Sequence, residues 1–343
     1  MTRPILITLG DAAGIGPEII AKAFQHHPTD LVDCVVVGDV ATMRRAAALV
    51  KTALQLPIAE LGSLAEFKHL PRCIQVLQQG ELLAPVSIGL VSGLAGRKAA
   101  DCIVWAAQAV LSGQASAMVT APIHKEALAA AGTWAAQFPG HTEMLQAEAA
   151  KFLGKPVADL PVRMMLANDE LKTVLVSIHM SLRKAIEAVT FDNVLETLRI
   201  THNTLSKTLG RAPHIGVAGL NPHAGEGGLF GSEELTIIAP AIAAARAEGM
   251  QVSGPFAPDT VFMRARAKNG QPGEFEVVVA MHHDQGLIPV KYLGVEQGVN
   301  VTLGLPLVRT SPDHGTAFDI AGTGKADEAS LVAAIRMARK LAA

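Results

Sequence analysis

The chain has 343 residues, and its 29 Lys and Arg residues nearly balance 31 Asp and Glu residues, for a net charge of −2. That balance argues against nucleic acid as the main partner, because neutralising phosphates requires a basic face, and an aromatic content of 4% leaves few rings for stacking on bases. The length predicts two domains, and a hydrophobic content of 50% predicts large apolar cores.

Targeting and membrane signals are missing from the sequence. No apolar run approaches the roughly 18 residues that a spanning helix needs, and the first residues, MTRPILIT, lead into a strand-like run rather than a secretory signal. The three cysteines lack metal-ligand spacing, and Cys34, inside an apolar run, is expected to be a buried thiol. We therefore expect a cytoplasmic protein that does not associate with a membrane.

Apolar strand-like runs alternate with helical stretches, which is typical of an α/β fold with a largely parallel sheet. In chain order, strands are expected at Ile5–Thr8, Cys34–Val37, Ala117–Thr120, Val174–Ile178, Ile215–Ala218 and Glu276–Ala280. The clearest helices are expected at Ser232–Glu248, with Ser232 as N-cap, and at Glu328–Leu341. Residues 268–274 are expected to form an exposed turn.

The first strand is followed by a glycine-rich loop, Gly10–Gly16, and then by Pro17 and Glu18, which both suit a helix start. Asp39 closes the next strand, where a ribose-binding acid would stand. However, the glycines are spaced G-x-x-x-G-x-G, so the dinucleotide-binding fingerprint G-x-G-x-x-G is not met. From this segment alone, a tight structural turn and a functional loop are equally good interpretations.

Histidine is the residue type that points most clearly to chemistry. His179, His223 and His283 each follow a predicted strand within a short polar cluster. Any one of them alone is best interpreted as a hydrogen-bonded loop histidine, but the shared setting favours a metal site, since three imidazoles with one open position form a catalytic centre. Asp284 is placed to orient the imidazole of His283.

A second set of polar residues suggests an anionic ligand. Lys291, Asn300 and Arg309 follow one another in the C-terminal third of the chain, and Arg309 stands in an otherwise apolar stretch, where a buried charge needs a partner. His141 and Thr142, in the cluster Gly140–Glu143, are further candidate substrate contacts. Solvated loop charges are the plainer interpretation for a lone lysine such as Lys291.

The segment DHGTAFDIAG, residues 313–322, resembles the cofactor loop of the isocitrate and isopropylmalate dehydrogenase superfamily, as does the N-terminal glycine-rich segment. Combined with the histidine set, it resembles more narrowly the 4-hydroxythreonine-4-phosphate dehydrogenase family of pyridoxal phosphate biosynthesis. The resembling motifs run from Gly10–Glu18 to residues 313–322, essentially the whole chain. The resemblance implies that the nicotinamide cofactor contacts His314, Gly315, Thr316, Ala317 and Asp319.

This resemblance implies two α/β domains with a cleft between them, one formed by residues 1–134 with 301–343 and the other by residues 135–300. It implies a divalent metal (Zn, Mg or Co) on His179, His223 and His283, and substrate contacts at His141, Thr142, Lys291, Asn300 and Arg309. It also implies a homodimer with the active site at the subunit interface.

The implied reaction is the metal-dependent, NAD-linked oxidation of 4-phosphooxy-L-threonine at its CH–OH group, with NADP as an alternative cofactor. The resulting β-keto acid decarboxylates to 3-amino-2-oxopropyl phosphate. For catalysis we expect Lys291, and Asp259 as the base, acting with His141.

Three departures keep an alternative substrate open. His282 stands where the family often has Tyr, Gly10–Gly14 reads GDAAG where the biosynthetic enzymes usually read GEPAG, and Leu229–Gly231 resembles a paralogous branch. That branch acts on 4-phospho-D-threonate or 4-phospho-D-erythronate in sugar-acid catabolism. A metal-dependent hydrolase is a remote alternative from another class, and it would have no use for the cofactor loop.

Overall fold

The computed structural model describes residues 3–50, 55–132 and 134–343. The chain divides into two compact α/β units, the first formed by residues 1–160 with 305–343 and the second by residues 161–304. The sequence likewise predicts a first domain formed by two separate segments of the chain, but the predicted boundary assigns residues 135–160 to the second domain. In the structure this segment includes helix α5 (His141–Leu153), which packs on α3 (Gly93–Leu111) of the first unit.

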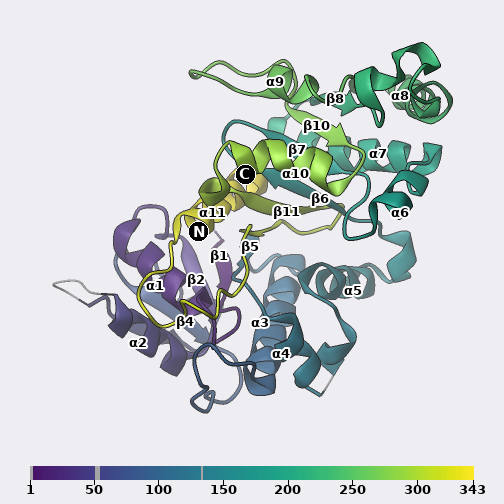
Figure 1. The fold of residues 1–343 in the computed structure, drawn as a ribbon. Helices are drawn as coiled ribbons and strands as arrows, with labels where there is room; N and C mark the ends of the chain where they lie inside the picture. Colours follow the sequence, from purple (N-terminus) through teal and green to yellow (C-terminus); the bar gives the residue numbers. More distant parts are fainter. Residues whose placement is uncertain (1–2, 51–54, 133) are drawn as a thin grey trace. The chain divides into compact units, whose positions relative to one another are not determined.

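The first unit is built on parallel strands with helices on both faces (Figure 1). In sheet order the strands are β3 (Ile58–Leu61), β4 (Ile74–Gln78), β2 (Cys34–Gly38), β1 (Ile5–Thr8), β5 (Ala117–Thr120) and β12 (Arg309–Pro312). Every pairing among them is parallel. The loops that leave their carboxyl ends therefore meet along one edge of the sheet, where ligands of open α/β sheets bind.

Two groups of helices cover this sheet. In the first group, helix α3 packs on β1, β2 and β5, with α4 (Lys125–Ala130) and α5 beside it. In the second group, α11 (Ala329–Ala342) contacts β1, β5 and β12, and α1 (Gly16–His26) packs against α11 and against α2 (Val40–Leu49). The buried side chains of Leu6, Val35 and Ile103 lie in the core under α3. Short 3-10 turns complete the unit at Leu64–Glu66, Trp134–Gln137 and Val157–Asp159.

The second unit contains a mixed sheet. Its order is β11 (Val299–Leu303), β6 (Arg163–Ala167), β7 (Lys172–Leu175), β10 (Val277–Ala280), β8 (His214–Ala218) and β9 (Gln251–Phe256). Strand β6 is antiparallel to both β11 and β7, whereas β7, β10, β8 and β9 run parallel. Nonpolar side chains of Leu166, Val278 and Leu287 form part of the core on one face.

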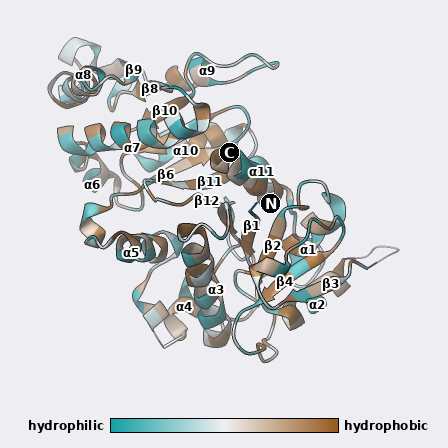
Figure 2. Cartoon of the chain, turned by 180° about the vertical axis from the view of Figure 1, so that it is seen from behind, coloured by the Kyte–Doolittle hydropathy of each residue, from teal (hydrophilic) through white to brown (hydrophobic). Residues whose placement is uncertain are grey.

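Helices also flank the sheet of the second unit. Helix α10 (His283–Tyr292) contacts β6, β7 and β10, α9 (Val261–Ala265) contacts β8 and β10, and α7 (Phe191–Leu209) packs on β6, β7, β11 and α8 (Ala239–Ala247). The remaining elements are α6 (Leu182–Glu187), 3-10 segments at Pro222–Gly228 and Val295–Gln297, and a π-helical turn at Glu234–Ile238. Figure 2 shows brown, apolar strands inside each unit and teal, polar surfaces on the covering helices.

The strand predictions are confirmed, two of them to the residue: Ile5–Thr8 and Ala117–Thr120. The strand predicted at Val174–Ile178 ends earlier, at Leu175, although the Val176 N–H still donates to the Ala280 carbonyl at 2.9 Å. Cys34 is buried as expected, and residues 268–271 form an exposed turn closed by a Lys268–Gln271 bridge. Among the described helices, none is both long and apolar enough to cross a membrane.

The helix predicted from Ser232 starts irregularly. The Ser232 carbonyl accepts the Thr236 N–H at 2.9 Å, but no hydrogen bond caps the helix through a side chain, and the first turn widens to a π-helix before α8 begins. Pro240 gives the physical reason, because it has no N–H to donate and its ring excludes the carbonyl of the preceding turn. The predicted N-cap role of the Ser232 side chain is therefore wrong.

Candidate functional site

The topology of the second unit brings the predicted metal ligands to one edge of its sheet. His179 follows β7, His283 opens the helix after β10, and His223 lies in the loop after β8. Because β7, β10 and β8 are parallel neighbours in that order, their carboxyl ends point the same way. Asp259 follows β9, the next strand along, and its side chain is exposed.

Two of the three histidines lie close together. The ring centres of His179 and His283 are 5.8 Å apart, with an angle of 45° between the rings. Two imidazoles on one tetrahedral zinc ion have ring centres roughly 5 Å apart, so this pair fits a shared cation. A cavity of about 450 Å³ adjoins them, and His282 and Ser181 also line it.

Asp284 orients the imidazole of His283 as predicted. The Asp284 Oδ1 lies 2.8 Å from the Nδ1 of His283, and this hydrogen bond holds the pKa of the exposed Asp284 carboxyl below its usual value. A histidine bonded through Nδ1 presents Nε2 to a ligand, the arrangement that metal sites use. Burial lowers the pKa of the neighbouring His282, which favours its neutral form.

His223 stands apart from this pair. It lies in the loop at Pro222–Gly228, its side chain is exposed, and its ring centre is 6.1 Å from that of Phe230. Among the described residues, no group of three or more His, Cys, Asp or Glu side chains is arranged to hold a metal ion. His179 and His283 lie close enough to share a cation, and the metal role of all three histidines remains a prediction.

The other candidates of the second unit occupy varied positions. Lys291 is exposed in the last turn of α10. Asn300 lies within β11, opposite Leu166 of β6, and is half-buried. Their predicted contacts with substrate remain predictions.

In the first unit, Arg309 is buried at the start of β12, with 4% of its surface exposed. Its Nε and Nη2 atoms both donate to the Thr120 Oγ1, at 3.1 and 2.7 Å. Burial lowers the pKa of Arg309 to about 10, against the opposing charge of Glu143. A guanidinium held in such a site favours an anionic ligand, because an anion compensates the desolvated charge.

His141 is the neighbour of Arg309 at this edge. Burial and the charge of Arg309 hold the pKa of His141 well below its usual value, despite a hydrogen bond to the backbone of Ala121. Its Nε2 is buried and has no hydrogen-bond partner among the described residues. His141 opens helix α5 and is followed by the half-buried Thr142, so both residues lie at a helix N-terminus, where backbone N–H groups bind anions.

The glycine-rich loop after β1 and the predicted cofactor loop after β12 are in direct contact. The Ile15 N–H donates to the Thr316 carbonyl at 3.0 Å, and a Cβ on Gly14 would lie 2.9 Å from the Thr316 Cβ. Ala317 adopts the left-handed region with φ of 40°. The tight turn at Gly10–Gly16 therefore supports the loop that carries His314, Gly315, Thr316, Ala317 and Asp319, and both interpretations of the glycine-rich loop stay open.

Two residues that sequence reasoning did not select stand at the same edge. Asp11 is fully buried, and its Oδ1 accepts the Ala13 N–H at 2.8 Å, whereas its Oδ2 has no hydrogen-bond partner in the described part of the chain. Burial raises the pKa of Asp11. The His124 ring stacks on Phe318 at 4.5 Å, and its Nδ1 is buried without a partner. Their position directly after β1 and β5 is the signal that identifies them.

Asp39 has a structural role in place of the ribose-binding one that its position suggested. It caps α2 and accepts hydrogen bonds from the backbone N–H groups of Leu83 and Thr42, from the Thr42 hydroxyl and from the Gln78 amide. Burial alone would raise its pKa, but these hydrogen bonds outweigh it and lower the pKa. With its oxygens occupied, Asp39 has little capacity left for a ligand.

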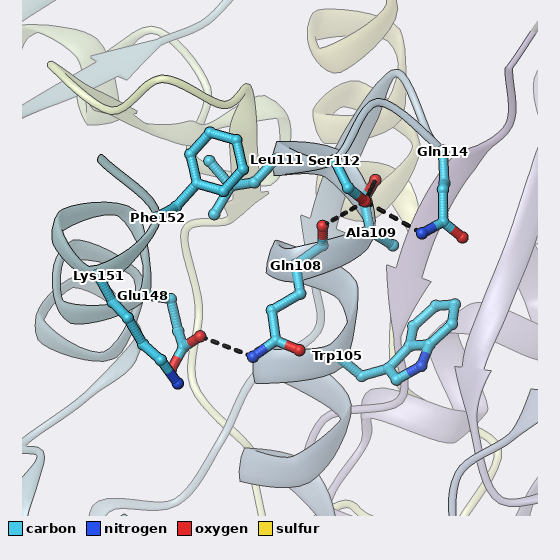
Figure 3. Close-up of a pocket in the computed structure, with 9 residues that line it drawn as sticks. All are labelled: Trp105, Gln108, Ala109, Leu111, Ser112, Gln114, Glu148, Lys151 and Phe152. Atoms are coloured by element: carbon cyan, nitrogen blue, oxygen red, sulfur yellow. Dashed lines mark hydrogen bonds between the residues drawn. The ribbon is translucent and has the colours of Figure 1, made fainter. Parts of the chain in front are cut away.

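A further hollow of about 470 Å³ lies between α3 and α5, and Figure 3 shows its lining. There the Gln108 amide donates to Glu148 at 2.8 Å, and the Phe152 ring lies beside Leu111. None of the predicted site residues lines this hollow, so it does not belong to the candidate site.

Comparisons with known proteins show which family this chain resembles over its length. The family model described as "Pyridoxal phosphate biosynthetic protein PdxA" matches residues 30–338. A 4-hydroxythreonine-4-phosphate dehydrogenase from Beijerinckia indica is 50% identical over 99% of this chain and 96% of its own length. A D-threonate 4-phosphate dehydrogenase from Salmonella typhimurium is 43% identical over 99% of both chains. The crystal structure of 4-hydroxythreonine-4-phosphate dehydrogenase from Klebsiella pneumoniae superposes with a TM-score of 0.87, at 40% identity and with 100% of both chains covered.

Proposed function

The chain belongs to the PdxA family of pyridoxal phosphate biosynthetic proteins, and from this premise we propose that it oxidises 4-phosphooxy-L-threonine with NAD⁺ as hydride acceptor. It is an oxidoreductase that acts on a CH–OH group and takes a nicotinamide cofactor. The observation that carries the substrate class is the buried Arg309 beside the neutral His141, because a desolvated guanidinium at a helix N-terminus suits a phosphate.

The proposed phosphate site combines charge with directed donors. The Arg309 guanidinium, the Thr142 hydroxyl and the first turn of α5 would bind the phosphate oxygens, since Arg presents several donors in a fixed geometry. Lys291 and Asn300 complete the proposed contacts with substrate. Held in this way, the reacting carbon is oriented for hydride transfer.

For the cofactor we propose NAD on the loop of residues 313–322, with NADP as an alternative. Support comes from the contact between this loop and the glycine-rich turn, and from the buried Nε2 of His314, which has no hydrogen-bond partner among the described residues. The proposed contacts are His314, Gly315, Thr316, Ala317 and Asp319.

For the metal we propose a divalent ion, Zn, Mg or Co, held by His179 and His283 with His223 as third ligand. The distance between the first two rings and the Asp284 hydrogen bond support this set. A bound divalent ion would supply Lewis acidity that eases proton loss from the substrate hydroxyl.

The proposed chemistry moves a hydride and a proton and then releases CO₂. Bound NAD⁺ would supply the hydride acceptor for the carbinol carbon, while Asp259 would accept the hydroxyl proton, with His141 as a neutral imidazole and Lys291 as further proposed catalytic groups. The product is a β-keto acid, which loses its carboxyl group as CO₂ and gives 3-amino-2-oxopropyl phosphate.

We also propose a homodimer in which the partner subunit completes the active site. Exposed apolar side chains flank two of the histidines: Met180 and Leu182 follow His179, and Leu229 and Phe230 follow His223. Apolar side chains gathered beside polar site residues are typical of a surface that another chain covers.

A second substrate has specific support, because relatives named D-threonate 4-phosphate dehydrogenases are 42–44% identical to this chain. Purified protein with NAD⁺ and a divalent metal should be incubated with 4-phosphooxy-L-threonine and, separately, with 4-phospho-D-threonate, while the absorbance of reduced cofactor is followed. We expect the higher kcat/KM with the first. A higher value with the second would assign the sugar-acid reaction, and no signal with either would refute the dehydrogenase proposal.

A further inference from the structure

The loop that carries His223 has an unusual backbone. Five consecutive residues, His223 to Gly227, have φ values of 52°, 53°, 79°, 43° and 67°, all in the left-handed region. Three of them, His223, Ala224 and Glu226, are not glycine. Because L-residues adopt this conformation at an energetic cost, such a run persists only where its surroundings hold it in place.

Glu234 is the residue that holds it. Only 2% of its surface is exposed, and its Oε1 accepts the backbone N–H groups of Leu220 and Asn221 at 2.8 and 2.7 Å. Its Oε2 accepts the side-chain amide of Asn221 at 2.9 Å. A single buried carboxylate thus binds the chain immediately before the left-handed run.

The loop is also folded closely around this carboxylate. A Cβ on Gly225 would lie 2.7 Å from the Glu234 Oε2, and a Cβ on Gly219 would lie 3.0 Å from its Oε1. Glycines at both positions let the backbone approach the carboxylate from two sides. The side chain of Glu234 therefore occupies the inside of the loop.

The secondary structure around Glu234 places its carboxylate inside the loop that carries His223. Glu234 is the first residue of the π-helical turn that precedes α8, and the N-terminus of a helix favours a negative charge. Widened turns of this kind are frequent at functional sites. The Oε2 of Glu233, one residue earlier, accepts a further hydrogen bond from the same Asn221 amide at 2.8 Å.

We propose that Glu234 is a positioning residue for His223: its carboxylate binds the chain at Leu220 and Asn221, and so holds residues 223–227 in the left-handed conformation and sets the direction of the imidazole. This rests on the proposed function in one respect, namely that His223 serves the active site. Glu234 itself touches neither substrate nor metal.

The test compares Glu234→Ala and Glu234→Gln with His223→Ala, and uses Glu248→Gln as a control, since Glu248 is an exposed carboxylate at the end of α8 that pairs with Arg199. The first readout is the imidazole NMR signal of His223, assigned by its loss in His223→Ala. We expect this signal to shift or broaden in Glu234→Ala, to move less in Glu234→Gln, which keeps an oxygen for the two backbone N–H groups, and to stay in place in the control.

The second readout is Co²⁺ affinity of the metal-free protein, measured by titration. We expect a 10- to 100-fold loss in Glu234→Ala, the usual effect of removing a group that orients a ligand, with partial recovery in Glu234→Gln and an unchanged KM for the phosphorylated substrate. An unaltered His223 signal in both Glu234 variants would overturn the inference. If the signal moves but His223→Ala binds Co²⁺ normally, the inference stands and the proposed metal role of His223 fails. Should Glu234→Ala not fold, the Glu234→Gln signal decides.

Discussion

Replacing Arg309 with Met should separate function from stability. The methionine keeps much of the buried volume while removing the charge and every donor of the guanidinium. If Arg309 binds the substrate phosphate through two charge-assisted hydrogen bonds, each worth about 1.5–3 kcal/mol, the loss is about 3–6 kcal/mol. That corresponds to a decrease in kcat/KM of about 100- to 10,000-fold.

The same substitution should leave the fold as stable as before or more so. Burial lowers the pKa of Arg309 to about 10, and the difference from the usual arginine value corresponds to a cost of about 3 kcal/mol for keeping the guanidinium charged in the folded protein. A folded pKa below the unfolded one means that folding disfavours the cation at neutral pH, so removing it is stabilising. Loss of the bonds to Thr120 offsets about 1–2 kcal/mol of that gain.

The assay is steady-state production of reduced cofactor together with urea unfolding at pH 7.5. Arg97→Met is the matched control, because Arg97 is an exposed arginine of the same unit that pairs with Asp101. It should change neither kcat/KM nor the unfolding free energy by a measurable amount. An unchanged KM in Arg309→Met, or a loss of more than about 3 kcal/mol in stability, would refute the reasoning, since Arg309 would then be a structural cation.

Three further results are expected. Because the pKa of folded His141 lies well below its usual 6.5, the unfolded chain binds a proton that the folded chain does not, so the free energy of unfolding should fall as pH drops below about 6.5. In urea unfolding at pH 7.5 and 5.5, His141→Asn should show a smaller change in this free energy between the two pH values than the wild type, and an equal change in both proteins would contradict the prediction. Gly14→Ala places a Cβ 2.9 Å from Thr316 and should weaken NAD⁺ binding at least 10-fold, as measured by calorimetry. An NAD⁺ affinity equal to that of the wild type would show that this loop does not bind the cofactor. Added Co²⁺ should restore activity to chelator-treated wild-type protein but not to His283→Ala, which should be inactive, and full turnover of the variant would exclude His283 as a metal ligand.

Sequence patterning alone determined the strands and the positions of the candidate residues along them. Ile5–Thr8 and Ala117–Thr120 are short apolar runs that end in polar residues, and such runs form buried parallel strands wherever they pack. Because parallel strands share one carboxyl edge, the histidines after β7, β10 and β8 could be expected at a common edge before any contact was known. The burial of Arg309 was likewise evident from its apolar neighbours.

Only the tertiary structure decided how these residues interact. Thr120 contacts Arg309 across 189 positions of sequence, and the lowered pKa of His141 depends on burial by distant segments and on that same Arg309 charge. The left-handed run at His223 and the carboxylate of Glu234 inside it are also invisible to local patterns. Hydrophobic periodicity reports which face of an element is buried, whereas hydrogen-bond partners, desolvation and backbone strain depend on which distant segments pack together.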